Sequence, residues 1–435
     1  MANATTSVTY PVGGSTLLRL GREFSGAVHL PGDPAYDELR RPLNPAIDPR
    51  PAIVAEALTA FDVQAAVRAA REEAMPVAVQ ATGHGLHRAY DGGLLIDTSA
   101  MCAVLVDPDR RIARVGPGAT WGQVIDAAAP FGLAPLAGSS PSVGVTGFTL
   151  GGGVGWLSRK YGYAADSVVR AEVVTGGGQL VTASAAEHTD LFWALRGGGG
   201  SFGVVTGLEF RLHPVASVYA GTSYFDVERA ADTLGVYRDW VAGAPDELST
   251  AVLITRLPDS GRRALALRVT HVGEASEAEG LIAPLRAAAG PALVEGFRSA
   301  PFGDVPMGGT PPRHLDLLEE LPDPALDFLV EAASDDGLGI STIEIRHWGG
   351  AMARPGADAG PVGLRGVPFS VIADASDPAL ADTLRPHATG GSFLNFLSDT
   401  DRTSSAFTPA DHERLRGIRA AYDPDDVFRL NHSIR

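Results

Sequence analysis

The sequence predicts a two-domain α+β protein. The chain has 435 residues, which is more than one ordinary hydrophobic core organises. Glycine-rich segments gather between residues 80 and 207, whereas residues 217–390 hold fewer glycines and more Asp, Glu, Arg and Pro. Short strands alternate with helices before this change in composition, and paired alternating strands with helices between them follow it. The second pattern is typical of an antiparallel sheet with helices on one side.

The first domain, for which we expect residues 1–215, begins with a strand, a helix and a second strand. Residues 51–58 are short and apolar, and from Ala60 the apolar residues recur at spacings of three and four, as in an amphipathic helix. Further strands are predicted over 76–80, 94–98, 103–107, 111–115 and 204–212, helices over 120–131 and 190–196, and a hairpin of 171–175 with 179–183. A junction is expected near His213-Pro214-Val215.

The second domain, expected over residues 216–400, has its own pattern. A hairpin of 250–257 with 263–272, strands over 341–348 and 367–373, and a helix over 274–288 are predicted. The remaining segment, 401–435, is predicted to form a helix over 408–421 and then a loop with a short strand that returns to the first domain.

Charge and cysteine content exclude several partners. The formal net charge of −16 repels phosphate backbones and anionic membranes, so we expect neither nucleic acid nor a membrane as partner. Cys102 is the only cysteine, so no internal disulfide or thiolate metal cluster can form. The segment from Met1 to Tyr10 lacks a basic region followed by an apolar one, and no long uncharged apolar run follows. We therefore expect a cytoplasmic protein; the sequence does not indicate its oligomeric state.

Glycine is unusually frequent. There are 52 glycines among 435 residues, roughly 12% against a usual level of about 7%. They mark either tight turns or places where the backbone closely approaches a large ligand. Because runs at 83–85, 138–155 and 197–203 are nearly free of bulky side chains, we expect these three to contact a flat ligand and the triple glycine at 176–178 to be a plain hairpin turn.

Two short motifs are set aside by their context. Gly198, Gly200 and Gly203 match the dinucleotide fingerprint, but that motif needs a strand before it and a helix after it. Here a predicted helix precedes and a strand follows, which argues against an NAD-dependent dehydrogenase. His84 and His87 stand three apart, yet the glycines beside His84 break any helix that would align them, and no carboxylate pair completes a metal shell. We expect no metal site.

Three segments resemble the flavoproteins of the para-cresol methylhydroxylase and vanillyl-alcohol oxidase superfamily, specifically its berberine bridge enzyme-like branch. They are PVAVQATGHG with DGGLLIDTS (76–99), GVTGFTLGGGVG through DLFWALRGGGGSFGVVT (144–206), and YDPDDVFRLNHSI (422–434). The likeness covers nearly the whole chain, strongly over 50–215 and 410–434 and weakly in between. It implies that the first domain and the C-terminal segment bind FAD, while the inserted domain covers the isoalloxazine ring.

The same resemblance implies which residues meet the cofactor. His84 stands where relatives carry the histidine that attacks the flavin 8α-methyl carbon and becomes covalently linked. The positions implied to contact FAD are His84, Gln80, Ala81, Thr82, Gly83, Gly85, Leu86, Ser139, Ser140, Val143, Gly144, Gly147, Leu150, Gly152, Gly155, Val205, Asn395 and Asn431. Some relatives form a second link through a cysteine, whose place Ser140 takes here, so a single attachment is expected.

A second departure concerns catalysis. Many relatives carry a Y-x-N-Y pattern, where this chain has Phe393-Leu394-Asn395-Phe396, and a phenyl ring cannot accept a proton. Alternation on the strand over 341–348 places Glu344 and Arg346 on the face opposite Ile343 and Ile345. We expect Glu344 as acid or base and Arg346 as the residue that orients an anionic group, although an ordinary charged strand face fits equally well.

The sequence thus predicts an FAD-dependent oxidase. We expect a hydride to pass from a small organic or secondary-metabolite substrate to flavin N5, with O₂ as the electron acceptor. The identity of the substrate is not readable, because the pocket belongs to the weakly matched middle domain. The alternative is a flavin-binding protein with a non-oxidative role, either cyclase-like or ligand-binding, which Phe393 and Phe396 keep open.

Overall fold

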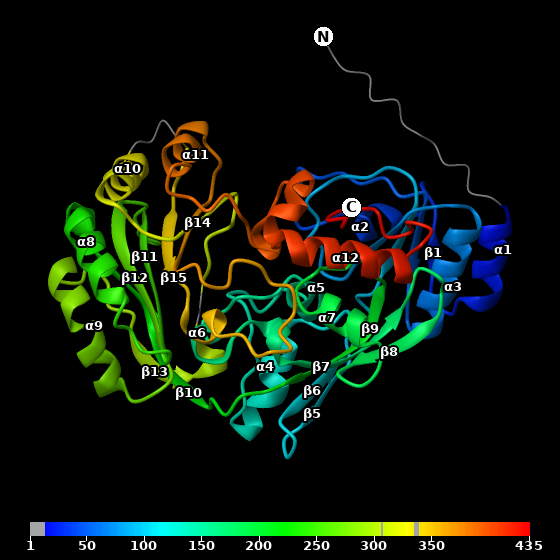
Figure 1. The fold of residues 1–435 in the computed structure, drawn as a ribbon, viewed down its shortest axis with the longest axis horizontal. Helices are drawn as coiled ribbons and strands as arrows, with labels where there is room; N and C mark the ends of the chain where they lie inside the picture. The colour runs from blue at the N-terminus through cyan, green and yellow to red at the C-terminus, as the bar shows by residue number, and fades with distance from the viewer. Residues whose placement is uncertain (1–13, 306–307, 335–338) are drawn as a thin grey trace, which may run out of the picture.

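Three β-sheets divide the chain into two lobes, one on each side of Figure 1. The computed structural model describes residues 14–305, 308–334 and 339–435. The segment from Met1 to Tyr10, on which the expected localisation partly rests, lies outside the described residues. Among the helices described, none has the length and apolar character needed to cross a lipid bilayer.

A four-stranded sheet leads into the loop that contains His84. Its order is β1 (Val28–His29), β2 (Ile53–Glu56), β4 (Leu94–Asp97) and β3 (Val77–Gln80). The strands β2, β4 and β3 are parallel, so their carboxyl ends share one edge of the sheet. Helix α3 (Ala60–Glu72) packs against it and begins at Thr59, whose side chain and that of Asp62 form a capping box. The short helices α1 (Gly14–Glu23) and α2 (Tyr36–Leu39) complete this layer.

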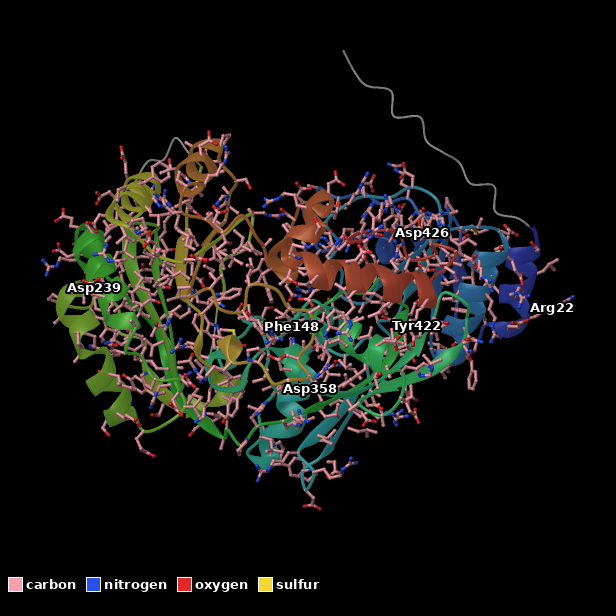
Figure 2. The ribbon with its side chains drawn as sticks, in the orientation of Figure 1. Arg22, Phe148, Asp239, Asp358, Tyr422 and Asp426 are labelled. Atoms are coloured by element: carbon pink, nitrogen blue, oxygen red, sulfur yellow. The ribbon has the colours of Figure 1, made fainter. Side chains whose placement is uncertain are left out.

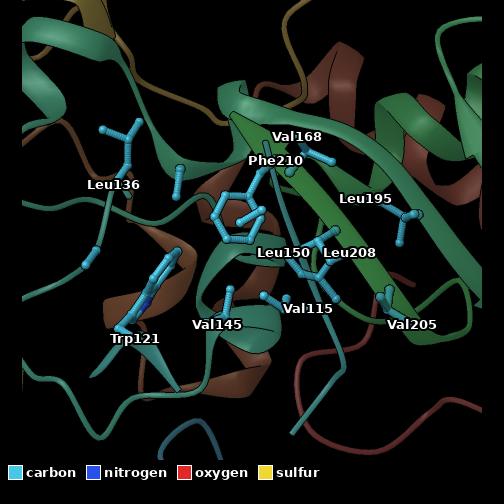
Figure 3. Close-up of a cluster of buried hydrophobic side chains, with 14 of the residues drawn as sticks. Val115, Trp121, Leu136, Val145, Leu150, Val168, Leu195, Val205, Leu208 and Phe210 are labelled. Carbon is cyan, nitrogen blue, oxygen red and sulfur yellow. The ribbon is translucent and has the colours of Figure 1, made fainter. Parts of the chain in front are cut away.

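A five-stranded antiparallel sheet forms the rest of this lobe. Its order is β5 (Val104–Asp107), β6 (Ile112–Val115), β9 (Val204–Arg211), β7 (Val168–Val174) and β8 (Leu180–Ser184). The helices beside it are α4 (Trp121–Ala128), α5 (Val145–Leu150), α6 (Ser158–Tyr161) and α7 (Thr189–Leu195). Figure 3 shows the core between sheet and helices, where Trp121 packs edge-on against Phe210. Helix α7 precedes the Gly198–Gly203 run and β9 follows it, which confirms the order that argues against a dinucleotide fingerprint.

The other lobe is a seven-stranded antiparallel sheet. Its order is β13 (Arg298–Pro301), β10 (Ser217–Phe225), β12 (Arg263–His271), β11 (Leu248–Arg256), β15 (Ile343–His347), β16 (Phe369–Ala373) and β14 (His314–Leu318). Helices α8 (Ala230–Val241), α9 (Ala275–Ala289), α10 (Asp323–Ser334) and α11 (Pro378–Leu384) lie on its outer face (Figure 1). Ile343 and Ile345 pack in the core on that side. The predicted antiparallel sheet with helices on one side is confirmed.

The C-terminal segment lies on the first lobe. Helix α12 (Pro409–Tyr422) packs against α7, and the N–H of Val77 at the start of β3 donates to the carbonyl of Val427. The short strand expected after Tyr422 is wrong, because the described residues 422–435 contain no strand. The buried carboxylate of Asp423 accepts hydrogen bonds from the N–H groups of Val427 and Phe428, which folds this stretch into turns.

Candidate functional site

Two loops of the first lobe meet at His84. The loop 81–87 follows β3 at the carboxyl edge of the parallel strands, and His84 within it is half-buried. Its Nδ1 lies 2.8 Å from Thr82 Oγ1, and its Nε2 lies 3.4 Å from Ser142 Oγ in the loop before α5. Burial lowers the pKa of His84, so the imidazole is neutral at neutral pH. A neutral imidazole keeps one nitrogen lone pair available for bonding.

The glycines around this junction fall into two groups. A side chain at Gly85, Gly147 or Gly200 would meet no atom within 4 Å, so these three border open space. Most others are needed because another part of the chain packs against them. A Cβ at Gly155 would overlap the carbonyl oxygen of Ala137. Added Cβ atoms would also crowd neighbouring residues at Gly83, Gly138, Gly152, Gly153, Gly197 and Gly203. The expectation that whole glycine runs form ligand surfaces is therefore too broad. Most of their glycines serve close packing.

The triple glycine at 176–178 forms the predicted hairpin turn and has a packing role as well. It turns between β7 and β8 as predicted, but a Cβ at Gly176 would overlap Asp423 and one at Gly178 would crowd Arg68. The turn is thus a packing site for α3 and the C-terminal segment, which is a stricter requirement than a plain turn imposes.

Open glycines and unpaired hydroxyls together suit a large polar cofactor. Within the described residues, the buried Oγ1 atoms of Thr146 and Thr149 on α5 have no hydrogen-bond partner. They belong to the same helix as Gly147, which borders open space. Buried polar atoms are nearly always paired in folded proteins, so these hydroxyls fit a bound group such as FAD. Both threonines and Ser142 were not among the contact residues predicted from the sequence, although all three lie within the glycine-rich run 138–155.

Several other expected contact residues serve the protein itself. Leu150 and Val205 lie in the hydrophobic core of the five-stranded sheet (Figure 3). The amide of Gln80 donates to the carbonyl of Leu39. Val143, Gly144, Ala81 and Leu86 lie within the two loops, and a Cβ at Gly144 would come 3.3 Å from Thr82 Oγ1.

Two asparagines connect distant segments to these loops. The Asn395 amide donates to the carbonyl of Phe148, and its oxygen accepts from the N–H of Gly153. Phe148 lies at the middle of the view in Figure 2, where the two lobes meet. The amide of Asn431 in the C-terminal tail donates to the carbonyl of Gly85, and its oxygen accepts from the N–H of His87. Both residues therefore fix the shape of the cofactor loops.

Aromatic side chains pack around Phe393, which stands where many relatives carry a tyrosine. Phe393 is buried, stacks on Tyr163 at 5.6 Å between ring centroids, and meets Trp348 and Phe396 edge-on. The Tyr163 hydroxyl is buried without a partner among the described residues, and its burial raises its pKa further above the ordinary value. A tyrosine that holds its proton so firmly is not a base at neutral pH.

The structure brings Glu344 and Arg346 together on the inner face of the seven-stranded sheet. Glu344 is fully buried, and Arg346 Nε donates to its Oε1 at 2.7 Å. Its Oε2 accepts from Arg268 Nη1 at 3.1 Å and from the Thr310 hydroxyl at 2.9 Å. Burial alone would raise the pKa of Glu344, but Arg346 and Arg268 lower it below the ordinary value.

Arg268 and Trp156 were not anticipated from the sequence. The strand register aligns Arg268 of β12 and Arg346 of β15 on either side of Ala251 in β11. Trp156, from the first lobe, packs on Ala251, and its ring lies 4.2 Å from the Arg346 guanidinium and 5.6 Å from that of Arg268. Alternation in the predicted hairpin places Arg268 on the inner face, but only the pairing of strands shows which residues lie opposite it.

Two hollows accompany these features. One of about 120 Å³ lies on the inner sheet face beside Arg268. The other, of about 600 Å³, is lined by the start of β3 at Pro76, by residues 88–91 and by the C-terminal tail including Asn431. Asn431 connects this hollow to the His84 loop, because its side chain is hydrogen-bonded to Gly85 and His87. In the part of the chain that the structure describes, no three His, Cys, Asp or Glu side chains gather to hold a metal ion.

Comparisons with known proteins also indicate that this chain binds FAD. A family model for an FAD binding domain matches residues 51–184, and one for berberine and berberine-like proteins matches residues 392–435. The (R)-6-hydroxynicotine oxidase of Paenarthrobacter nicotinovorans is 28% identical over 97% of this chain and 99% of its own length. A xylooligosaccharide oxidase of Thermothelomyces thermophilus is 34% identical over 45% of this chain and 43% of its own length. The solved structure of the BBE-like 1 protein of Physcomitrella patens superimposes with a TM-score of 0.86 at 23% identity, over 97% of this chain and 99% of that one.

The fold and the matched segments define an FAD-linked oxidoreductase. Within that class, the chain is similar to the berberine bridge enzyme-like flavoproteins: its C-terminal segment matches their family model, and the solved structure of one BBE-like protein shares its fold.

Proposed function

We propose that this protein is an oxidase of small organic molecules whose FAD is attached through His84 alone. The observation that carries the proposal is the His84 imidazole, held neutral between two loops and beside Gly85, where the structure leaves open space. When bound, FAD would supply the redox chemistry, with a substrate carbon as hydride donor and O₂ as electron acceptor.

The chain's own residues set the state of His84. If Nδ1–H donates to Thr82 Oγ1, the lone pair resides on Nε2, the nitrogen that lies toward Ser142. This is the tautomer that a nucleophilic attachment through Nε2 requires. Ser140, whose hydroxyl lies 2.9 Å from that of Ser142, offers no thiolate, so the proposal includes one covalent bond and no second one.

Glu344 is given a positioning role in this proposal. Arg346, Arg268 and Thr310 already donate to its two oxygens, and its pKa is lowered. A carboxylate so engaged binds a proton weakly, so it serves better as the fixed counter-ion of two arginines than as the acid or base expected from the sequence. Because Phe393 and Phe396 also bring no phenol, the proposal favours substrates that need no strong base from the protein.

The oxidase assignment is tested on purified, flavin-loaded protein. The flavin is photoreduced under argon with EDTA as the electron donor, and air is then admitted. An oxidase regains its yellow colour within seconds and releases one hydrogen peroxide per flavin. Reoxidation over many minutes would contradict the choice of O₂ as acceptor.

Substrate oxidation is tested separately. Small amines and alcohols, beginning with (R)-6-hydroxynicotine, are mixed anaerobically with the protein, and bleaching of the flavin absorbance is followed. Bleaching by any of them supports substrate oxidation and argues against the non-oxidative alternative. A flavin that dithionite reduces but that no compound bleaches would favour the alternative.

A further inference from the structure

We propose that the hollow on the inner face of the seven-stranded sheet binds a carboxylate group of the substrate, with Arg268 as its partner. The substrate would then be a small organic acid that carries its oxidisable C–H bond next to an amine or hydroxyl. This inference rests on the proposed oxidase function and specifies its substrate class.

The lining of the hollow suits an anionic group. Its volume of about 120 Å³ holds a headgroup rather than a whole drug-sized ligand. Beside the guanidinium of Arg268, the lining includes the hydroxyl-bearing residues Thr222, Tyr224, Thr255, Thr310 and Thr342. Hydroxyl and guanidinium groups are hydrogen-bond donors for a carboxylate, and among the described residues no Asp or Glu lines the hollow to repel it.

The buried charges beside the hollow do not cancel. Two arginines share the single carboxylate of Glu344, which leaves one surplus positive charge in a buried cluster. Burial lowers the pKa of Arg268; attraction to Glu344 opposes this effect without cancelling it, and repulsion from Arg346 adds to it. A buried unpaired charge is unfavourable, so a bound anion would stabilise the cluster.

The surplus positive charge lies on Arg268, the arginine that lines the hollow. Arg346 places both Nε and Nη2 against Glu344 Oε1 and lies over the Trp156 ring, so its charge is largely matched. Arg268 reaches Glu344 through Nη1 only, while its Nε donates to Thr222 Oγ1. The register aligns Arg268 directly opposite Thr222, and that pairing holds the guanidinium against the hollow. Glu344 thus fixes two arginines but neutralises only one.

The hollow adjoins the cofactor loops. Gly309 lines it, and a Cβ at Gly309 would overlap Ser139 Oγ. Ser139 stands in the same loop as Ser142, which meets His84. A carboxylate bound at Arg268 would therefore anchor a substrate whose other end extends toward the His84 junction.

Binding of benzoate to the flavin-loaded protein tests the proposal without requiring turnover. Benzoate is titrated while the visible flavin spectrum and tryptophan fluorescence are recorded, since Trp156 lies against both arginines. We expect saturable binding of benzoate, at least tenfold weaker binding of its uncharged analogue benzamide, and no competition by inorganic phosphate at equal concentration. Equal affinity for benzoate and benzamide would overturn the carboxylate site, and tight competition by phosphate would replace it with a phosphate site.

Variants separate the site from the fold. Arg268→Gln is expected to weaken benzoate binding at least tenfold, whereas Arg268→Lys, which keeps the charge, should retain most of it. Arg256→Gln, at the exposed far end of β11, is the matched control and should bind like the native protein. If Arg268→Gln is flavin-loaded and binds benzoate normally, the proposal is wrong. If that variant does not fold, the binding of benzoate and of benzamide is measured on Arg268→Lys instead. Equal affinity for the two compounds would overturn the carboxylate site. A protein that binds benzoate but fails the reoxidation test retains the site while losing the oxidase function.

Discussion

The proposed cofactor side and the proposed substrate side of this protein are built in different ways. The proposed cofactor side consists of the loop 81–87 and of residues 138–155, which include α5, and here backbone, glycine and small hydroxyl residues lie close along the chain. The substrate side is a sheet face, where Thr222, Arg268, Ala251 and Arg346 come from four separate strands. A function carried by contiguous loops is visible as a motif. One assembled across strands becomes visible only when their register is known.

The largest expected effect distinguishes two glycines within one cofactor motif. Gly155→Ala forces a methyl group into the carbonyl oxygen of Ala137 and should destabilise the protein by more than about 4 kcal/mol. Gly147→Ala places its methyl in open space within α5 and should change stability by no more than about 1 kcal/mol, in the favourable direction. Urea unfolding of the two apoproteins measures both.

The same pair tests which glycine borders the cofactor. If Gly147 lines the FAD site, Gly147→Ala should fold normally but contain less flavin per protein, as measured by the ratio of visible to ultraviolet absorbance. Full flavin content in a stable Gly147→Ala protein would remove Gly147 from the site.

On the substrate side, Glu344→Gln should have the next largest effect. Removing the buried carboxylate leaves two arginines facing each other without a counter-ion, which should cost about 3–5 kcal/mol. Because the pKa of Glu344 in the folded protein is lowered, its contribution is present above the unfolded pKa of about 4.3. It is lost as the pH falls through the lower folded value.

Unfolding curves over a pH range measure this. The difference in unfolding free energy between the native protein and Glu344→Gln should be constant near neutral pH and shrink below about pH 4. A difference that stays constant into the acid range would mean that Glu344 is not the ionised partner of Arg268 and Arg346. The control is Glu413→Gln on the exposed side of α12, which should change stability by less than about 1 kcal/mol.

A smaller effect is expected where the two sides join. Asn395→Ala removes the hydrogen bonds to Phe148 and Gly153 and should lower stability by about 1–3 kcal/mol. It should also lower flavin content, because these bonds hold the glycine segment after α5 in shape. Asn44→Ala, in a surface turn where the side chain accepts only from Ala46 N–H, is the matched control. Equal flavin content in both variants would limit Asn395 to a structural role.

The difference between contiguous loops and paired strands explains which features could be predicted from the sequence. Most strands of the first lobe, the hairpin of β11 with β12, and the helix-covered antiparallel sheet were predictable because apolar periodicity reports them directly, and Ile343 and Ile345 pack as the alternation required. The strands β1, β10, β13 and β14 and the helices α5, α8 and α10 were not predicted. The His84 loop was predictable through its resemblance. The role of most glycines was not, because Gly155 is needed by Ala137, a partner that only the fold brings near. Arg268 escaped notice for the same reason, since its link to Glu344 crosses 76 positions of sequence.

The most direct test of the central claim is to locate the flavin on the chain. The yellow protein is denatured in acid and digested with trypsin, and the flavin-bearing peptide is sequenced by mass spectrometry. We predict that the flavin resides on the peptide between Arg71 and Arg88, at His84, that His84→Ala abolishes the attachment, and that the neighbouring His87→Ala does not. Release of all flavin into the acid supernatant, or its attachment at any other residue, would contradict the account.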